Sequence, residues 1–169
     1  MNTVIRANKL MGMLVLIILS VGYVNAQEVT LAPSAPPGIN ILPYVISGNL
    51  IFISGQVPLE NGKVKYTGKV GSKVSEAQAI EAAKLAAENV LTQLKTAVGD
   101  LNKVKRCVKL SGYVNAEPNF TRHSYVINGA SDTIINALGE NGRHARIAIG
   151  AASLPMDAAV EVEAIFELK

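Results

Sequence analysis

The sequence predicts an α+β domain in which helices pack on one face of a mixed β-sheet. Three observations support this class: two β-prone runs around a Gly-Asn turn, one long amphipathic helical segment, and a C-terminal segment in which apolar and acidic residues alternate. The 169 residues fit a single domain with an appended segment. With 49% hydrophobic and only 17% charged residues, the chain does not have the composition of a disordered protein.

A β-hairpin is predicted near the start of the domain. Residues 44–46 and 50–53 are rich in β-branched and aromatic side chains, and they flank Ser47-Gly48-Asn49, which favours a tight turn. Ser54-Gly55-Gln56 ends the second strand, and residues 62–67 could add a short third strand.

A long helix is the clearest element of the sequence. Ser75 is a favourable N-cap, and Gln78 stands three residues later, at the spacing of a capping box. Gly99 follows the last apolar residue, at a position where helices commonly end. One apolar stripe recurs at helical spacing: Ala79, Ala83, Ala86, Val90, Leu94 and Val98. Because the alanines are small, we expect the helix to lie close to the sheet.

Residues 104–114 form a predicted strand with alternating faces. The expected buried face holds Val104, Val108, Leu110 and Val114, and the other face holds Lys103, Lys105, Lys109 and Tyr113. A basic strand face could bind phosphate, but a solvated sheet face is the more common reason for this pattern.

Three further elements complete the domain. Residues 119–138 are predicted to be helical with a break at Gly129, and residues 145–149 and 158–168 are predicted strands. The last strand alternates cleanly, with Val160, Val162, Ala164, Phe166 and Leu168 on one side and Glu161, Glu163 and Glu167 on the other.

The first 26 residues have the parts of a secretory signal peptide. Arg6 and Lys9 precede an apolar run over residues 10–21, and Val24-Asn25-Ala26 supplies small residues at a cleavage position. We therefore expect an exported protein, periplasmic or secreted, with no stable membrane anchor after cleavage. A retained anchor is the alternative, although the run is short for a span of about 20 residues.

Cleavage after Ala26 would leave 143 residues, with 14 Lys+Arg against 13 Asp+Glu. Residues 27–43 contain four prolines and are predicted to be an extended lead-in to a single domain at residues 44–169. Because the processed chain is almost neutral, little attraction to nucleic acid is expected, and no nucleic-acid partner is predicted.

The composition also excludes several kinds of site. Two histidines and one cysteine cannot supply the four ligands of a Cys/His zinc site, and one cysteine cannot form an internal disulfide. Residues 62–69 imitate a phosphate loop, but their spacing is wrong by one and Val70 stands where Ser or Thr should be. Cys107 is interpreted as a small buried hydrophobic residue rather than a nucleophile.

Three segments together resemble a known family. They are Leu42-Pro43-Tyr44-Val45 with Phe52-Ile53-Ser54-Gly55-Gln56-Val57-Pro58, then Ala145-Arg146-Ile147-Ala148, then Leu154-Pro155-Met156-Asp157 followed by Val160-Glu161-Val162-Glu163-Ala164. Their order and spacing are similar to those of the RidA family of reactive imine and enamine deaminases, also called the YjgF family. The resemblance covers residues 41–168.

The resemblance implies a chorismate-mutase-like α+β subunit. It also implies a homotrimer, in which the sheets pack into a central barrel and three clefts lie between neighbouring subunits. The substrate class that it implies is a small carboxylate-bearing 2-imino acid or its enamine, which is hydrolysed to a 2-keto acid and ammonia. It implies no metal and no organic cofactor.

The resemblance assigns site residues by position. Arg146 matches the arginine that clamps the substrate carboxylate, and Glu161 matches the glutamate that positions or activates water. Tyr44 and Ser54 match two residues that line the cleft. A guanidinium offers a fixed, permanently charged fork to a carboxylate, and a carboxylate can accept a proton from attacking water, so the residue types suit the chemistry.

The chain also differs from many deaminases of the family. Ala148 replaces a cysteine, Pro118 stands in place of an asparagine, and His144 replaces the proline before the Ala-Arg pair. His144 is predicted to lie in the cleft, where it could act as an acid or base or bind the substrate carboxylate. The alternative is a loop histidine without a role in the site. Arg143 and Arg146 together could also form a doubly basic anion site.

Three functions remain open at this point. A RidA-like deaminase would release ammonia in a manner that depends on Arg146. A non-catalytic trimer would bind a small organic acid in the same cleft without turnover. A holdase-like interaction module would keep its activity after Arg146→Ala.

Overall fold

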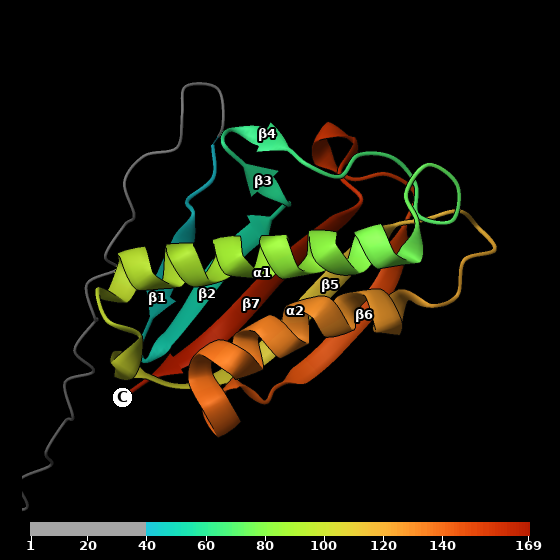
Figure 1. Cartoon of the computed structure of the whole chain (residues 1–169). Coiled ribbons are helices and arrows are strands. Elements are labelled where there is room, and N and C mark those ends of the chain that lie inside the picture. The colour runs from blue at the N-terminus through green and yellow to red at the C-terminus, as the bar shows by residue number, and fades with distance from the viewer. Residues whose placement is uncertain (1–39) are drawn as a thin grey trace, which may run out of the picture.

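The computed structural model describes residues 40–169 (Figure 1). The predicted signal peptide at residues 1–26 lies outside the described residues, as does most of the proline-rich lead-in at residues 27–43. Within the described part, none of the helices is long and apolar enough to cross a membrane.

Seven strands and two long helices make up the domain. In chain order they are β1 (Tyr44–Ser47), β2 (Leu50–Gln56), β3 (Leu59–Glu60), β4 (Lys63–Val64), α1 (Glu76–Val98), β5 (Val104–Asn115), α2 (His123–Leu138), β6 (Ala145–Ala151) and β7 (Val160–Leu168). Short 3₁₀ turns at 101–103, 139–142 and 155–157 join some of them.

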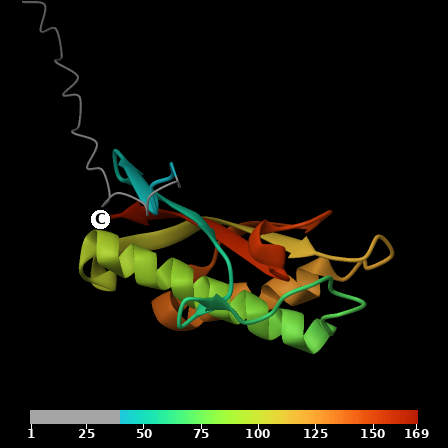
Figure 2. The same ribbon diagram turned by 90° about the horizontal axis from the view of Figure 1, so that it is seen from above.

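Five of the strands form one mixed sheet in the order β1-β2-β7-β5-β6. The pair β5–β6 is parallel and is joined through α2, and the other neighbours are antiparallel. Figure 2 shows α1 and α2 side by side on one face of this sheet. The predicted α+β class, with helices on one face of a mixed sheet, is therefore confirmed.

The short strand predicted within residues 62–67 forms as β4 (Lys63–Val64), and it pairs with β3. Residues 62–67 do not join the main sheet. Instead β3 and β4 form a small hairpin of their own, closed by Asn61 and Gly62, both of which have a positive φ.

Helix α1 forms as its sequence predicts. The Ser75 side chain accepts a hydrogen bond from the Gln78 backbone, and the Gln78 side chain accepts one from the Ser75 backbone, so the capping box is complete. Gly99 ends the helix with φ 77°. All six residues of the predicted stripe are buried, together with Ala82 and Ala87. This stripe packs against the sheet and forms much of the core.

Strand β5 departs from the predicted alternation. Its pairing with β7 shifts register between Val104 and Arg106 and again between Cys107 and Lys109. Each irregularity adds a residue to one strand, so the side chains beyond it no longer follow the simple alternation between the two faces. As a result Val108, which was predicted to be buried, is 37% exposed, and Cys107 is buried at 1%.

Helix α2 is unbroken, so the predicted break at Gly129 is wrong, as is the predicted start at Asn119. The helix begins at His123 and runs through Gly129 to Leu138. A Cβ at Gly129 would overlap the backbone carbonyl oxygen of Ile80 on α1. This glycine therefore allows the two helices to lie close together.

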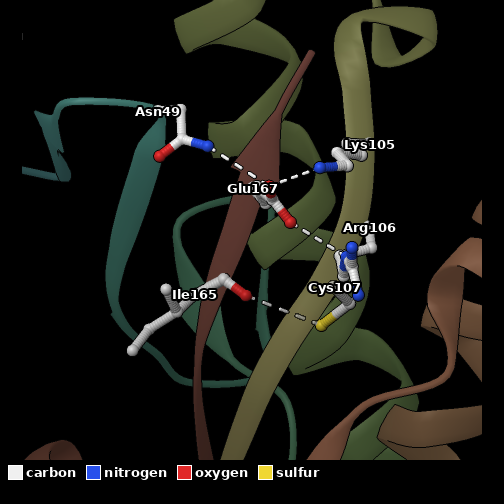
Figure 3. Close-up of polar contacts among 6 residues, drawn as sticks. All are labelled: Asn49, Lys105, Arg106, Cys107, Ile165 and Glu167. Carbon is white, nitrogen blue, oxygen red and sulfur yellow. Dashed lines mark hydrogen bonds and ion pairs between the residues drawn. The ribbon is translucent and has the colours of Figure 1, made fainter.

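Near the end of β7, Glu167 joins three segments of the chain (Figure 3). Its carboxylate accepts hydrogen bonds from Asn49 at 3.2 Å and Lys105 at 2.7 Å, and it pairs with Arg106 at 2.9 Å. The hydrogen bond from Lys105 is the first reason that the pKa of Glu167 is lowered, and the charges of Lys105 and Arg106 lower it further.

We expect Glu167→Gln to lower the melting temperature at pH 7 and to have little effect near pH 3. A carboxylate whose pKa is lower in the folded state stabilises the fold above its unfolded pKa of about 4.3, and this stabilisation is lost as the pH falls through the folded value. Thermal unfolding followed by circular dichroism at several pH values measures the difference. Glu88→Gln, at an exposed carboxylate on α1, is the control. An equal loss of melting temperature at pH 7 and pH 3 would contradict the conclusion that the ionised Glu167 carboxylate stabilises the fold.

Cys107 lies beside this cluster, under the sheet. Its thiol is 3.9 Å from the Ile165 carbonyl oxygen and 3.8 Å from that of Lys109. Burial raises the pKa of Cys107 to about 12. A thiol of this kind is protonated and unreactive at neutral pH, which agrees with its interpretation as a buried hydrophobic residue.

Candidate functional site

Arg146 lies on β6, the strand at one edge of the sheet. It pairs with the buried Leu110 of β5, and its side chain extends toward α2. Its Nη1 donates to Asn128 Oδ1 at 2.8 Å and to Ser131 Oγ at 3.1 Å, while its Nη2 donates to the Ser124 carbonyl oxygen at 3.4 Å. All three acceptors are neutral, so the charge of the guanidinium is held in place without being compensated.

The other arginines of the described residues have carboxylate partners. Arg106 pairs with Glu167, Arg122 forms two hydrogen bonds with Glu76, and Arg143 pairs with Glu140. Among the four arginines in residues 40–169, Arg146 alone has no carboxylate within ion-pair distance. This leaves Arg146 able to bind a carboxylate from outside the chain.

Arg143, the second arginine of the predicted doubly basic site, has a carboxylate partner of its own. Its Nε donates to Glu140 Oε2 at 2.7 Å on an exposed turn, and this bond raises its pKa. A charge that is already paired three residues away contributes little to anion binding at Arg146.

His144 connects to Arg146 through a serine. Its Nδ1 lies 2.6 Å from the Gly142 carbonyl oxygen, and its Nε2 lies 3.0 Å from Ser131 Oγ, the atom that also accepts from Arg146. Both ring nitrogens are therefore engaged within the chain. The predicted contact of His144 with a substrate is not what this geometry favours, because neither nitrogen is left for a ligand.

Glu161 lies on the opposite face of the sheet. Its neighbours Val160 and Val162 are buried under the helices, so the side chain of Glu161 points to the uncovered face. There the carboxylate lies against Gly55, and a Cβ at that position would require the Glu161 side chain to move. Burial raises the pKa of Glu161, and the charge of Glu163 raises it further. A half-buried carboxylate of this kind can take up a proton more readily than an exposed one.

The two remaining predicted residues have structural partners. Tyr44 is 7% exposed and belongs to the core. Ser54 donates its hydroxyl proton to the Leu42 carbonyl oxygen at 2.6 Å, which ties the segment before β1 to β2. Ser54 directly precedes Gly55, the residue against which the Glu161 side chain lies.

A hollow of about 440 Å³, missed by the sequence reasoning, lies where β5 and β6 end and α2 begins. Its lining includes Lys69, Glu117, Phe120 and His123, with residues 150–152 on the β6 side. The Lys69 ammonium donates to three carbonyl oxygens there, so it joins the segments that form the wall. The only signal in the sequence was the row of small residues after Ile149. No group of three or more His, Cys, Asp or Glu side chains in the described residues is arranged to hold a metal.

The sequence and fold match those of known proteins. A family described as "YjgF/chorismate_mutase-like, putative endoribonuclease" matches residues 23–168. Protein TCP17 of Trypanosoma cruzi is 45% identical over 141 residues, which cover 83% of this chain and 88% of that protein. The chain belongs to the YjgF/RidA family.

Two solved structures share the fold of this YjgF/RidA chain. The protein Atu1372 of Agrobacterium tumefaciens, of unknown function, is 50% identical with a TM-score of 0.77, over 82% of this chain and 86% of that one. A protein of Shewanella oneidensis described as a "putative endoribonuclease" is 33% identical with a TM-score of 0.76, over 82% and 91% of the two chains. The expected RidA-like fold of the subunit is thus confirmed.

Within one chain of this RidA-family protein, the predicted site residues form two groups. Arg146 and His144 meet through Ser131 on the helical side of the sheet, whereas Glu161 lies against Gly55, the residue after Ser54, between β2 and β7. The two groups are on opposite faces. Sequence patterns alone do not predict this separation, because it depends on the register of β6 against β5.

Proposed function

We propose that this protein is a hydrolytic deaminase of small imines or enamines that carry a carboxylate. The products are a 2-keto acid and ammonia. The observation that carries the proposal is the unpaired charge of Arg146, the one described arginine without a carboxylate partner. Membership of the YjgF/RidA family supports it.

Arg146 binds the substrate carboxylate. Its Nη groups are directed to α2, and its Nε–H has no acceptor among the described residues. A carboxylate can approach from this side and form a charge-assisted hydrogen bond. Because the guanidinium is already held by three contacts, little side-chain entropy is lost when the ligand binds.

Glu161 takes the proton of the attacking water. The water oxygen forms a bond to the imine carbon as the C=N π bond breaks, and the nitrogen takes up a proton, which gives a carbinolamine. The hydroxyl proton of this intermediate is then transferred to the nitrogen, so that the C=O bond forms, the C–N bond breaks and ammonia leaves. The imine carbon is electrophilic from the start, so orientation and one general base are sufficient. The raised pKa of Glu161 suits a group that must both accept and return a proton.

A cleft that uses both groups is proposed to lie between subunits of a homotrimer. Arg146 and Glu161 face opposite sides of the sheet of one chain, so a single subunit cannot present both to one small molecule. Phe52, Ile147 and Ile149 are each at least 40% exposed, and apolar side chains of this size favour burial against a second copy. The proposed location of the protein is outside the cytoplasm, on the basis of the predicted signal peptide.

The test is ammonia release from the imine that an L-amino-acid oxidase forms from leucine. We expect the protein to accelerate ammonia release above the spontaneous rate, with heat-denatured protein as the blank. An imine without a carboxylate, formed from benzylamine by an amine oxidase, should be hydrolysed at the spontaneous rate, because Arg146 has nothing to bind. Equal rates with and without native protein would contradict the proposal.

A non-catalytic binder is the second candidate. The separation of Arg146 from Glu161 within one chain favours it, because the arginine alone binds an organic acid without activating water. Calorimetry with pyruvate distinguishes the two: binding that depends on Arg146, without acceleration of imine hydrolysis, would support the binder.

A further inference from the structure

We propose that Ser131 and His144 are positioning residues for Arg146, and that they fix its guanidinium before the ligand arrives. This rests on the proposed function in one respect, that Arg146 binds a ligand carboxylate. It assigns His144 a role different from direct contact with the substrate.

With a neutral His144 ring, one assignment of donors and acceptors satisfies these hydrogen bonds. The Gly142 carbonyl oxygen can only accept, so the proton of the neutral His144 ring is on Nδ1, and Nε2 is an acceptor. Ser131 therefore donates its single hydroxyl proton to Nε2 at 3.0 Å. The lone pairs of Ser131 Oγ then point toward Nη1 of Arg146, at 3.1 Å. In this arrangement His144 orients the serine, and the serine orients the arginine.

The series of hydrogen bonds begins at the carbonyl group of Gly142, whose backbone is held in place by packing. Gly142 is buried, and a Cβ at this position would lie 2.6 Å from the Ile134 carbonyl oxygen and 2.7 Å from Ile135 Cα. The backbone of Gly142 thus lies against α2 where only a glycine fits. Ser131 is part of α2 itself and is 8% exposed. The backbone carbonyl and the hydroxyl are both held by the same helix, so the ring of His144 fits between two fixed groups.

The effect on Arg146 is to restrict a long side chain on an edge strand. An arginine loses about 2 kcal/mol of side-chain entropy when it is fixed, and a ligand that had to fix it would bind more weakly. Ser131 and Asn128 use both protons of Nη1, which sets the plane of the guanidinium. The Nε–H side then faces away from these acceptors, ready for a carboxylate.

The first test needs no ligand. The Nη1–H signals of Arg146 are measured by ¹H–¹⁵N NMR at low temperature and assigned by their loss in Arg146→Lys. We expect Ser131→Ala and His144→Asn to speed the exchange of these Nη1 protons with water about tenfold, because both variants weaken the hydrogen bond from Nη1 to position 131. His144→Asn keeps a donor near Gly142 but does not reach Ser131. His144→Gln places an acceptor near the position of Nε2, so it should restore much of the protection.

The second test measures function with the same variants. In the imine assay, Ser131→Ala and His144→Asn should raise KM about tenfold with a smaller change in kcat, and His144→Gln should restore KM. If the unaltered protein neither hydrolyses the imine nor binds pyruvate, the proposed function fails, and the NMR test still decides the positioning role. Unchanged exchange of the Nη1 protons in both Ser131→Ala and His144→Asn, or no difference between His144→Asn and His144→Gln, would overturn the positioning role.

Discussion

Arg146→Ala is expected to lower kcat/KM for a carboxylate-bearing imine by about a hundredfold, which corresponds to about 2.7 kcal/mol. The variant removes the only described guanidinium that has no carboxylate partner, so the ligand carboxylate loses its charged contact. Arg146→Lys keeps a point charge but loses the fork and the contacts to Asn128 and Ser131, and a loss of about tenfold is expected. Initial rates of ammonia release over a range of substrate concentrations measure both values.

Arg143→Ala is the matched control for this prediction. It removes a neighbouring arginine of equal charge, three residues away, which is exposed and paired with Glu140. We expect its kcat/KM to stay within a factor of two of the unaltered protein, as for most exposed ion pairs. If Arg143→Ala and Arg146→Ala reduced the rate equally, the loss would be explained by a general electrostatic effect and not by specific binding of the carboxylate to Arg146. Full activity in Arg146→Ala would remove the deaminase mechanism and favour an interaction module.

Gly129→Ala is expected to destabilise the fold by about 1–3 kcal/mol. In an ordinary helix the same change stabilises by up to about 1 kcal/mol, because alanine has the highest helix propensity. Here the new Cβ would overlap the carbonyl oxygen of Ile80, so α1 and α2 must move apart over their shared contact. Urea unfolding at equilibrium measures the change in the free energy of unfolding.

Asn136→Ala is the control for that prediction, since Asn136 is an exposed position on the same helix. It should be neutral or slightly stabilising. A stabilised Gly129→Ala would show that the two helices are not in close contact at this position.

Local patterns predicted those parts of the fold that depend on neighbouring residues. The capping box of Ser75 and Gln78, the buried stripe of α1 and the alternation of β7 are all set by side chains within a few positions of one another, and all three are confirmed. The hairpin β1–β2 followed for the same reason, from its turn residues.

The errors arose where distant segments decide the geometry. The register shifts of β5 against β7 exposed Val108, and periodicity within β5 contains no information about its partner. Gly129 weakens a helix in isolation, but in the protein it is the point at which α1 approaches α2. A propensity rule cannot distinguish these two uses of a glycine.

The site was predicted only in part, for the same reason. The resemblance to the family identified Arg146 and Glu161 by position. It did not predict that their side chains face opposite sides of the sheet. Ser131 and Asn128 were not identified at all, because polar residues on an amphipathic helix usually face solvent. Only the parallel pairing of β6 with β5 brings Arg146 under that part of α2.

Because Cys107 is buried, the reactivity of its thiol can report local unfolding of this protein around β5. It is the only cysteine of the 169-residue chain, and its thiol is under the sheet between β5 and the helices. A thiol reagent in excess can therefore label the native protein only when β5 separates from the core. The labelling rate, followed by mass spectrometry without denaturant, would give the population of this open state and show how far any variant has shifted it.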